Sequence, residues 1–253
     1  MTTRRSLHRL AISALSVAAA IALWDVLSRL MASPELLPRP GAVFATFWQM
    51  SISGELLRAV GDSAARVLVG YTLGVLAGIV TGLMLGSVRA LNDTIGLIFD
   101  FVKGIPPIAI VPVVIIWLGI GEVSKYVVIA YIVWIVVAIS TAVGAREIPL
   151  VRLRAGVFLG LSRLAIFRRI VLPSCLPYVL AGMRSAIGFA FVALVSAELI
   201  AANSGIGQII MDARFALQTS RMIVGLLVLG ALGALVQAIF DAVVGRLRIA
   251  TRF

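Results

Sequence analysis

Residues 60–85, VGDSAARVLVGYTLGVLAGIVTGLML, decide the fold class of this chain. Apart from Asp62 and Arg66 near its start, the stretch carries no charged side chain. About 20 largely apolar residues in an α-helix are enough to cross the hydrocarbon core of a membrane. The stretch therefore predicts a membrane-spanning helix.

Five further runs have the same character, at residues 10–31, 95–118, 126–143, 174–202 and 222–244. The chain is 61% hydrophobic and only 13% charged, with a mean hydropathy of +1.11. A soluble domain has about 45–50% apolar and about 25% charged residues, so the surplus of apolar side chains must face lipid. We predict an all-α membrane protein with about six transmembrane helices.

The composition also excludes several classes of function. The single cysteine, Cys175, excludes an intramolecular disulfide and a cysteine-built metal cluster. The single histidine, His8, lies in the N-terminal tail, which argues against a histidine-based catalytic centre. No G-x-x-x-x-G-K-[ST] motif is present, so this chain does not bind ATP through a P-loop of its own. We expect no catalytic residue, no metal site and no cofactor.

The basic residues lie at the ends of the apolar runs rather than on one compact face, which argues against nucleic-acid binding despite a net charge of +11. If the N-terminus is cytoplasmic, thirteen basic residues lie on the cytoplasmic side: Arg4, Arg5, Arg9, Arg89, Arg146, Arg152, Arg154, Arg163, Arg168, Arg169, Arg246, Arg248 and Arg252. Six lie toward the outside: Arg29, Arg39, Arg58, Lys125, Arg214 and Arg221. This asymmetry predicts that both termini are cytoplasmic. A cleaved signal peptide is the alternative for residues 10–31, although that run is longer than the apolar region of a typical signal.

A glycine stands at every fourth position of the second span, at Gly70, Gly74, Gly78, Gly82 and Gly86. In a helix these glycines form one smooth face on which another backbone can approach closely. We expect this face to pack against a neighbouring helix or a second copy of the chain. A substrate path along the same face is the alternative.

Charged residues within spans are costly and need partners. Asp62 and Arg66 are four residues apart, and Asp100 and Lys103 are three apart, so each pair can meet on its own helix. Glu198 has no basic neighbour at helical spacing, and Arg184 is about 21 Å away along the axis. Glu198 is a candidate gate or interhelical hydrogen-bonding residue, with snorkelling as the alternative, and Arg184 is a further pathway candidate.

The third run contains Pro106, Pro107 and Pro112. Proline frees backbone carbonyl groups that must find other partners. The pattern fits a kinked helix that lines a translocation cavity, so Pro106 and Pro107 are pathway candidates. A kink that only shapes packing is the alternative.

Residues 144–172 form the longest cytoplasmic segment. Pro149 suits the first turn of a helix, Gly160 a left-handed C-cap, and Ser162 the N-cap of a second short helix at residues 163–169. The segment fits a basic amphipathic loop on anionic lipid. It also fits a docking element for a cytoplasmic partner.

The same segment resembles the motif E-A-A-x3-G-x9-I-x-L-P of ABC importer permeases. Gly160 stands for the glycine of the motif, and the spacing to Ile170, Leu172 and Pro173 is the same. The wider text GLSRLAIFRRIVLPSCLPYVLAGMRSAIG, at residues 160–188, is similar to permeases of the nitrate, sulfonate, taurine and bicarbonate group. So are LLPRPGAV (36–43), DSAARVLVGYTLG (62–74), PPIAIVP (106–112), WLGIGEVSK (117–125), AELI (197–200) and GIG (205–207). The first three motif positions are Arg154, Ala155 and Gly156, so an arginine replaces the glutamate.

The resemblance implies a type I ABC importer permease with a methionine-importer-like fold in the bacterial inner membrane. Residues 59–246 would form the core domain, preceded by a tail, helix and external loop at 1–58 and followed by a cytoplasmic tail at 247–253. A second permease copy, most simply in a homodimer, would complete the path. ATPase subunits would bind ATP, and an external solute-binding protein would deliver substrate. The residues implied in ATPase docking are Arg154, Ala155, Gly156, Gly160, Ser162, Arg163, Ile170, Leu172 and Pro173.

Two other classes of function are compatible with a hydrophobic helical chain. A secondary transporter would couple to an ion gradient and usually contains inverted repeats, which are not visible here. A membrane scaffold would transport nothing. An ATPase that co-purifies with the chain would favour the importer. The resemblance implies a small solute of sulfonate, nitrate, bicarbonate or vitamin-precursor type, and the sequence leaves open which one is carried.

Overall fold

The computed structural model describes the backbone of residues 2–31, 35–201 and 203–250, and the side chains of residues 15–31, 35–200 and 203–246. Within these ranges the chain is helical and forms no strand. The α-helices are α1 (Thr2–Leu30), α2 (Pro40–Ile52), α3 (Glu55–Ser87), α4 (Arg89–Lys103), α5 (Pro107–Leu118), α6 (Glu122–Arg146), α7 (Leu150–Phe158), α8 (Arg163–Ile166), α9 (Leu172–Ala201), α10 (Ile206–Phe215) and α11 (Thr219–Ala250). A π-helical turn, Phe167–Val171, joins α8 to α9.

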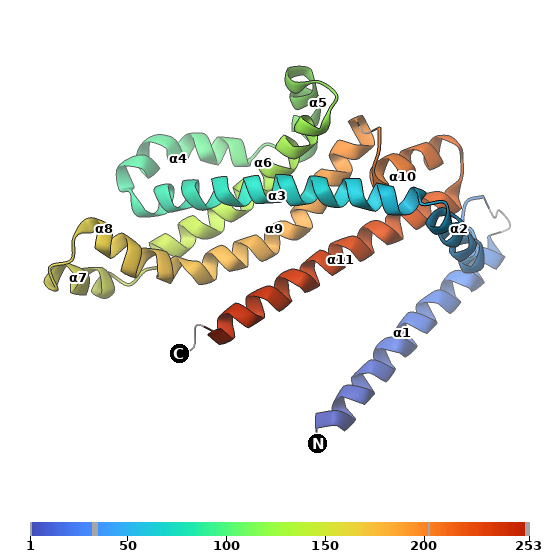
Figure 1. Cartoon of the computed structure of the whole chain (residues 1–253), viewed down its shortest axis with the longest axis horizontal. Helices are drawn as coiled ribbons and strands as arrows, with labels where there is room; N and C mark the ends of the chain where they lie inside the picture. Colours follow the sequence, from blue (N-terminus) through green and yellow to red (C-terminus); the bar gives the residue numbers. More distant parts are fainter. Residues whose placement is uncertain (1, 32–34, 202, 251–253) are drawn as a thin grey trace.

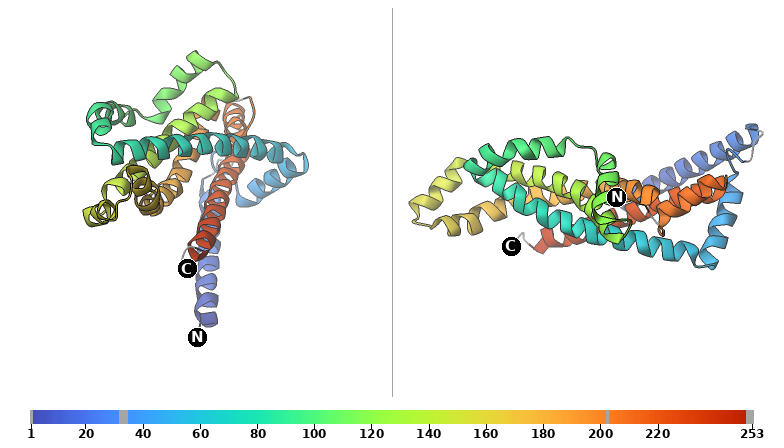
Figure 2. Two further views of the ribbon diagram at one scale, coloured as in Figure 1. Left: turned by 60° about the vertical axis from the view of Figure 1, so that its left-hand side comes forward. Right: turned by 90° about the horizontal axis from the view of Figure 1, so that it is seen from above.

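Helices α3, α6 and α9 form the centre of the bundle, and α11 runs beside them (Figure 1). Their contact surfaces hold an apolar core in which Val133, Ala186 and Leu194 are fully buried. Helix α1 contacts α2 and extends away from the bundle, as Figure 1 and the left view in Figure 2 show. The short helices α7 and α8 lie at one end of the long helices, and α2 and α10 lie at the other.

Four continuous helical segments in the described residues are long and apolar enough to cross a membrane. They are α3, α6, α11 and the continuous run from α8 through α9. The pair α4 and α5 adds a fifth span if it counts as one broken helix. The first expected span, at residues 10–31, falls in α1, but its side chains before Leu15 lie outside the described residues. The side chains of Arg4, Arg5, His8, Arg9, Arg248 and Arg252 lie outside them as well.

The prediction of one kinked helix at residues 95–118 is wrong. Helices α4 and α5 are separate and meet at an angle of 97°. Pro106 is extended, with ψ at 137°, because a residue that precedes proline is pushed away from the helical region. The hydroxyl of Tyr131 on α6 lies 2.6 Å from the carbonyl oxygen of Val102 and 3.1 Å from that of Ile105, so its single proton is shared between them at the break. The Val102 carbonyl also accepts from the N–H of Ile105 at 3.1 Å.

The glycine face of α3 packs against α6. A Cβ atom on Gly70 would lie 2.6 Å from the Cβ of Ile129, and one on Gly74 would lie 2.6 Å from the carbonyl oxygen of Ala130. The distances are equally short at Gly78, Gly82 and Gly86. The face is therefore filled by α6 over its whole length, which leaves no room for a substrate path along it.

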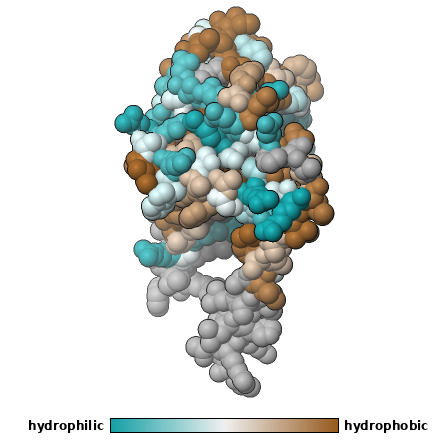
Figure 3. Space-filling view, turned by 90° about the vertical axis from the view of Figure 1, so that its right-hand side faces the viewer, coloured by the Kyte–Doolittle hydropathy of each residue, from teal (hydrophilic) through white to brown (hydrophobic). Residues whose placement is uncertain are grey.

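The end of the bundle formed by α2 and α10 carries polar side chains. Seen from this end, polar residues are mixed with apolar ones (Figure 3). A hollow of about 500 Å³ opens here, lined by Glu35, Thr46, Gln49, Leu217, Gln218, Thr219, Ser220 and Arg221. Its polar lining fits a surface in water rather than in hydrocarbon.

Candidate functional site

The turn between α7 and α8 has the local structure that its sequence predicts. Gly160 has a φ of +70°, the N–H of Leu161 donates to the carbonyl of Gly156, and the N–H of Gly160 donates to Val157. This is the Schellman pattern of a glycine-ended helix. The Ser162 hydroxyl accepts from the backbone N–H of Ala165 at 3.2 Å and so caps α8.

The prediction of a separate second short helix at residues 163–169 is wrong. Helix α8 continues through the π-helical turn into α9 without a break. Pro173 has no N–H to donate to the carbonyl four residues earlier, so the regular hydrogen-bond ladder is interrupted at the turn. Leu172 is the first residue of α9 and Pro173 lies in its first helical turn. Helix α8 and the long helix α9 are therefore one continuous helical segment.

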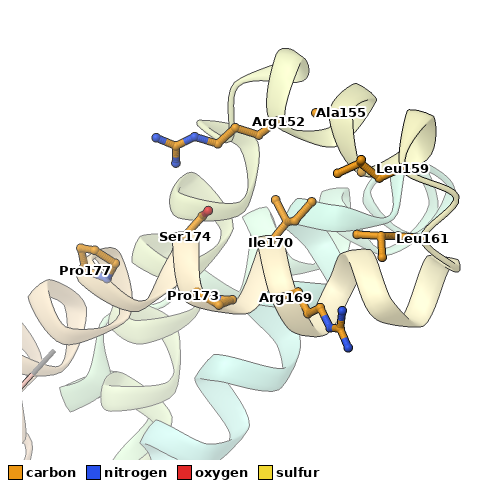
Figure 4. Close-up of a pocket in the computed structure, with 10 residues that line it drawn as sticks. Arg152, Ala155, Leu159, Leu161, Arg169, Ile170, Pro173, Ser174 and Pro177 are labelled. Atoms are coloured by element: carbon orange, nitrogen blue, oxygen red, sulfur yellow. The ribbon is translucent and has the colours of Figure 1, made fainter. Parts of the chain in front are cut away.

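Helix α7 folds back onto the π-helical turn through Gly156, the position where the motif has its second alanine. Gly156 is buried, and a Cβ on it would lie 2.8 Å from the Cδ1 of Ile170. A hollow of about 680 Å³ opens beside this contact, lined by Arg152, Ala155, Gly156, Leu159, Leu161, Arg169, Ile170, Pro173, Ser174 and Pro177. Leu159, Leu161 and Ile170 lie around the space between α7 and the turn (Figure 4).

The surface around this hollow is both apolar and strongly basic. Phe158 is 90% exposed, and Leu150, Val151, Val157, Leu159 and Leu164 are also exposed. Five exposed arginines accompany them: Arg152, Arg154, Arg163, Arg168 and Arg169. Among the described residues no carboxylate forms an ion pair with any of the five. Large exposed apolar side chains next to unpaired charges are typical of an interaction surface.

A second cluster of charged and polar groups lies between α3, α6 and α9, near the opposite end, and is buried except for Glu122. The guanidinium of Arg66 donates to Glu122 on α6 (2.7 and 2.8 Å) and to Glu198 on α9 (2.6 Å). It also donates to the backbone oxygen and the hydroxyl of Ser204 (2.7 and 2.6 Å). These bonds use all five N–H donors of the arginine.

Glu198 links this cluster to the start of α10. Its carboxylate accepts from the Ser63 hydroxyl (2.8 Å) and from the backbone N–H of Gly207 (2.7 Å), and the Ser63 oxygen accepts from the N–H of Ile206 (2.9 Å). Glu198 is only 1% exposed, so the snorkelling alternative is wrong. A Cβ on Gly205 would lie 2.4 Å from both Arg66 and Glu198, which explains a glycine at this point.

The other charged residues of the spans separate into two cases. The expected pair of Asp62 with Arg66 does not form, because Arg66 turns inward to the two glutamates while Asp62 is exposed. The Asp100–Lys103 pair forms on α4 at 2.7 Å. Arg184 does not join Glu198; it pairs with Asp241 on α11 at 2.8 Å.

Sequence reasoning did not nominate Glu122, Lys125, Ser63 or Ser204. Glu122 and Lys125 lie in the quoted stretch WLGIGEVSK, and Ser63 lies in DSAARVLVGYTLG. Two signals in the sequence could have indicated them. The first is that these polar residues lie at span ends, in stretches that resemble the family. The second is that Glu198, if buried, needs a cation from another helix. In the described residues, no group of three or more His, Cys, Asp or Glu side chains could hold a metal ion.

Comparison with known proteins agrees with this architecture. Residues 70–249 match the model of the family "Binding-protein-dependent transport system inner membrane component". The chain belongs to this family. It is therefore a permease of the ABC importers, as the quoted motifs indicate.

Individual relatives cover most of the permease. The aliphatic sulfonates transport permease protein SsuC of Escherichia coli K12 is 34% identical over 216 residues, which is 85% of this chain and 82% of the relative. The taurine transport system permease protein TauC of the same organism is 31% identical over 219 residues, 85% of this chain and 80% of the relative. The nitrate import permease protein NrtB of Synechocystis sp. PCC 6803 is 33% identical over 69% of this chain and 64% of the relative.

A solved structure of the MetNI methionine ABC transporter in an inward-facing conformation is similar in fold. The TM-score is 0.66 at 23% identity, over 78% of the permease and 96% of the matched chain. The expected fold of a type I importer permease is thereby confirmed.

Proposed function

We propose that the permease forms one half of a transmembrane path for small oxyanions, completed by a second copy of itself. The names of SsuC, TauC and NrtB indicate aliphatic sulfonates, taurine and nitrate as substrates of those relatives. These three share an anionic group with several oxygens. An external solute-binding protein would deliver the anion, and the polar hollow between α2 and the link from α10 to α11 is a suitable place for it to dock.

The observation that carries the proposal is the surface of residues 144–172. Its exposed apolar side chains and its unpaired arginines make it suited to a cytoplasmic ATPase, because an exposed side chain such as Phe158 gains stability only when a partner covers it. Since α8 continues into α9, closure of two ATPase subunits would pull on a spanning helix. Both termini would be cytoplasmic in this arrangement, on the same side as the loop.

Co-purification with the cognate ATPase tests the proposal. Gly160→Val places a β-branched residue at a φ of +70°, and Arg154→Glu reverses the charge at the position of the motif glutamate. Both variants should insert normally and lose most of the ATPase during detergent purification. Arg89→Glu, which makes the same charge change at an exposed site on α4 outside the loop, should retain it.

Two outcomes contradict the proposal. Equal retention in Gly160→Val, Arg154→Glu and the unmodified permease would exclude docking through this loop. A loop that only adsorbs to lipid would respond to its total charge, so the joint change of Arg163 and Arg168 to Gln would then release the segment from anionic vesicles, whereas Gly160→Val would not.

A further inference from the structure

One carboxylate is shared by two buried cations at the start of α6. Glu122 accepts from the Nε and Nη2 atoms of Arg66 at 2.7 and 2.8 Å and from the Nζ of Lys125 at 2.8 Å. The side chains of Arg66 and Lys125 are 2% and 5% exposed, whereas that of Glu122 is 48% exposed. Of these three side chains, only the Glu122 carboxylate, which neutralises both cations, is substantially exposed to solvent.

The rest of the cluster holds Arg66 in place independently of Glu122. Its Nη1 atom donates to Glu198, and Ser204 accepts from both Nη1 and Nη2. Among the described residues Lys125 has no hydrogen-bond partner other than Glu122, which leaves two of its three donors free. If Glu122 moves away, Arg66 and Lys125 face the single negative charge of Glu198. The pocket then has a net charge of about +1, and an unpaired buried charge is strongly unfavourable.

The geometry that Glu122 satisfies is that of a small oxyanion. Two oxygens of one planar group meet two parallel N–H donors of a guanidinium, which is the bidentate arrangement that arginine makes with carboxylate and phosphate groups. A sulfonate or a nitrate also presents two oxygens to such a fork. A bound monoanion would replace the negative charge that the pocket loses when Glu122 moves away. Lys125 adds a point charge for a remaining oxygen.

Glu122 is placed where it can leave. It is the first residue of α6 and follows a turn with Gly119 and Gly121, where an added Cβ would meet nothing within 4 Å. Gly119 has a φ of +79°, so the turn is built on a conformation that suits glycine. Ser63, Arg66 and Glu198 instead lie in the interiors of long packed helices. A movement of the turn would remove Glu122 without moving the other three.

We propose that Arg66 and Lys125 form an oxyanion-binding site that Glu122 occupies in the present state as a built-in substitute for the anion. Movement of residues 119–122 exposes the site, and an organosulfonate or nitrate monoanion takes the place of the Glu122 carboxylate. The choice of a sulfonate or nitrate as the anion rests on the proposed function. The site itself is inferred from the contacts of Arg66 and Lys125 alone.

Thermal unfolding of the full-length permease in detergent tests the site. Glu122→Ala should have a lower Tm than the unmodified chain, and sodium methanesulfonate should raise it by about 3–6 °C at about ten times its dissociation constant, whereas sodium chloride at the same ionic strength should not. Asp100→Ala is the matched control, because it removes the acidic member of the exposed i, i+3 pair with Lys103. Methanesulfonate should raise its Tm by less than that of Glu122→Ala, because the Glu122 carboxylate still competes for the site.

Two more measurements make the test decisive. Adding Lys125→Met to Glu122→Ala should abolish the response to methanesulfonate, and Glu122→Gln replaces the alanine variant if that one does not purify. In the unmodified permease, methanesulfonate should increase amide hydrogen exchange in residues 119–125 at least twofold over chloride. Equal effects of the two anions on the Glu122 variant, or unchanged exchange in the unmodified chain, would overturn the proposal. The assay uses no ATPase, so its failure is distinct from a failure of ATPase docking.

Discussion

The contact between α3 and α6 predicts a sharp response to the smallest possible substitution, Gly78→Ala. The added Cβ would lie 2.7 Å from the Cβ of Val137 and 2.9 Å from the carbonyl oxygen of Trp134. Carbon atoms pack best at about 3.5–4.0 Å, so the methyl group is about 1 Å too close to its neighbour. One of these contacts is with backbone, so rotation of a side chain cannot relieve the overlap and the two helices must separate.

The expected cost follows from that separation. Extra methyl groups in a well-packed core cost about 1–3 kcal/mol. Alanine recovers up to about 1 kcal/mol through its higher helix propensity. A net loss of up to about 2 kcal/mol corresponds to a fall in Tm of up to about 8 °C for a domain of this size. Gly78→Leu should go further and prevent assembly of the bundle.

Thermal unfolding of the purified permease is the assay, with Gly61→Ala as the matched control. Gly61 lies on the same helix, is exposed, and an added Cβ there meets nothing within 4 Å. Its replacement should leave the Tm unchanged or raise it slightly. If Gly78→Ala and Gly61→Ala have the same Tm, the close approach of α3 to α6 does not determine the stability of the bundle and the reasoning is refuted.

Three further predictions concern topology, the Glu198 cluster and the helix break. In a Cys175→Ser background, Arg163→Cys should resist an impermeant thiol reagent in intact cells and react after lysis; labelling of intact cells would place the loop outside. Ser63→Ala should lower the stability by about 1–3 kcal/mol, because the buried N–H of Ile206 loses its acceptor, whereas the partly exposed Ser196→Ala should not; equal denaturation midpoints would contradict this. Tyr131→Phe should increase amide hydrogen exchange in residues 102–105 selectively, because the hydroxyl that donates to the carbonyl groups at the break is lost; unchanged exchange would show that the break is stable without it.

The features that the sequence determined by itself are local. A run of apolar residues, a glycine at every fourth position and the cap residues Gly160 and Ser162 act within one helix or one turn. Their consequences follow from helical periodicity and backbone sterics alone. The Asp100–Lys103 pair belongs here too, since both side chains lie on one face of α4 without help from another helix.

Tertiary structure alone decided which partners the buried charges take. Arg66 has an acidic residue four positions away, yet it bonds to Glu122 and Glu198, which are 56 and 132 residues distant in the chain. The local pair would leave Glu198 buried without a cation, and an unpaired buried carboxylate costs far more than an exposed ion pair contributes. The break between α4 and α5 has the same kind of cause. Proline interrupts the helix, but the sequence does not give the 97° angle between α4 and α5 or the contact across the break, where the Tyr131 hydroxyl of α6 donates to the carbonyl of Val102.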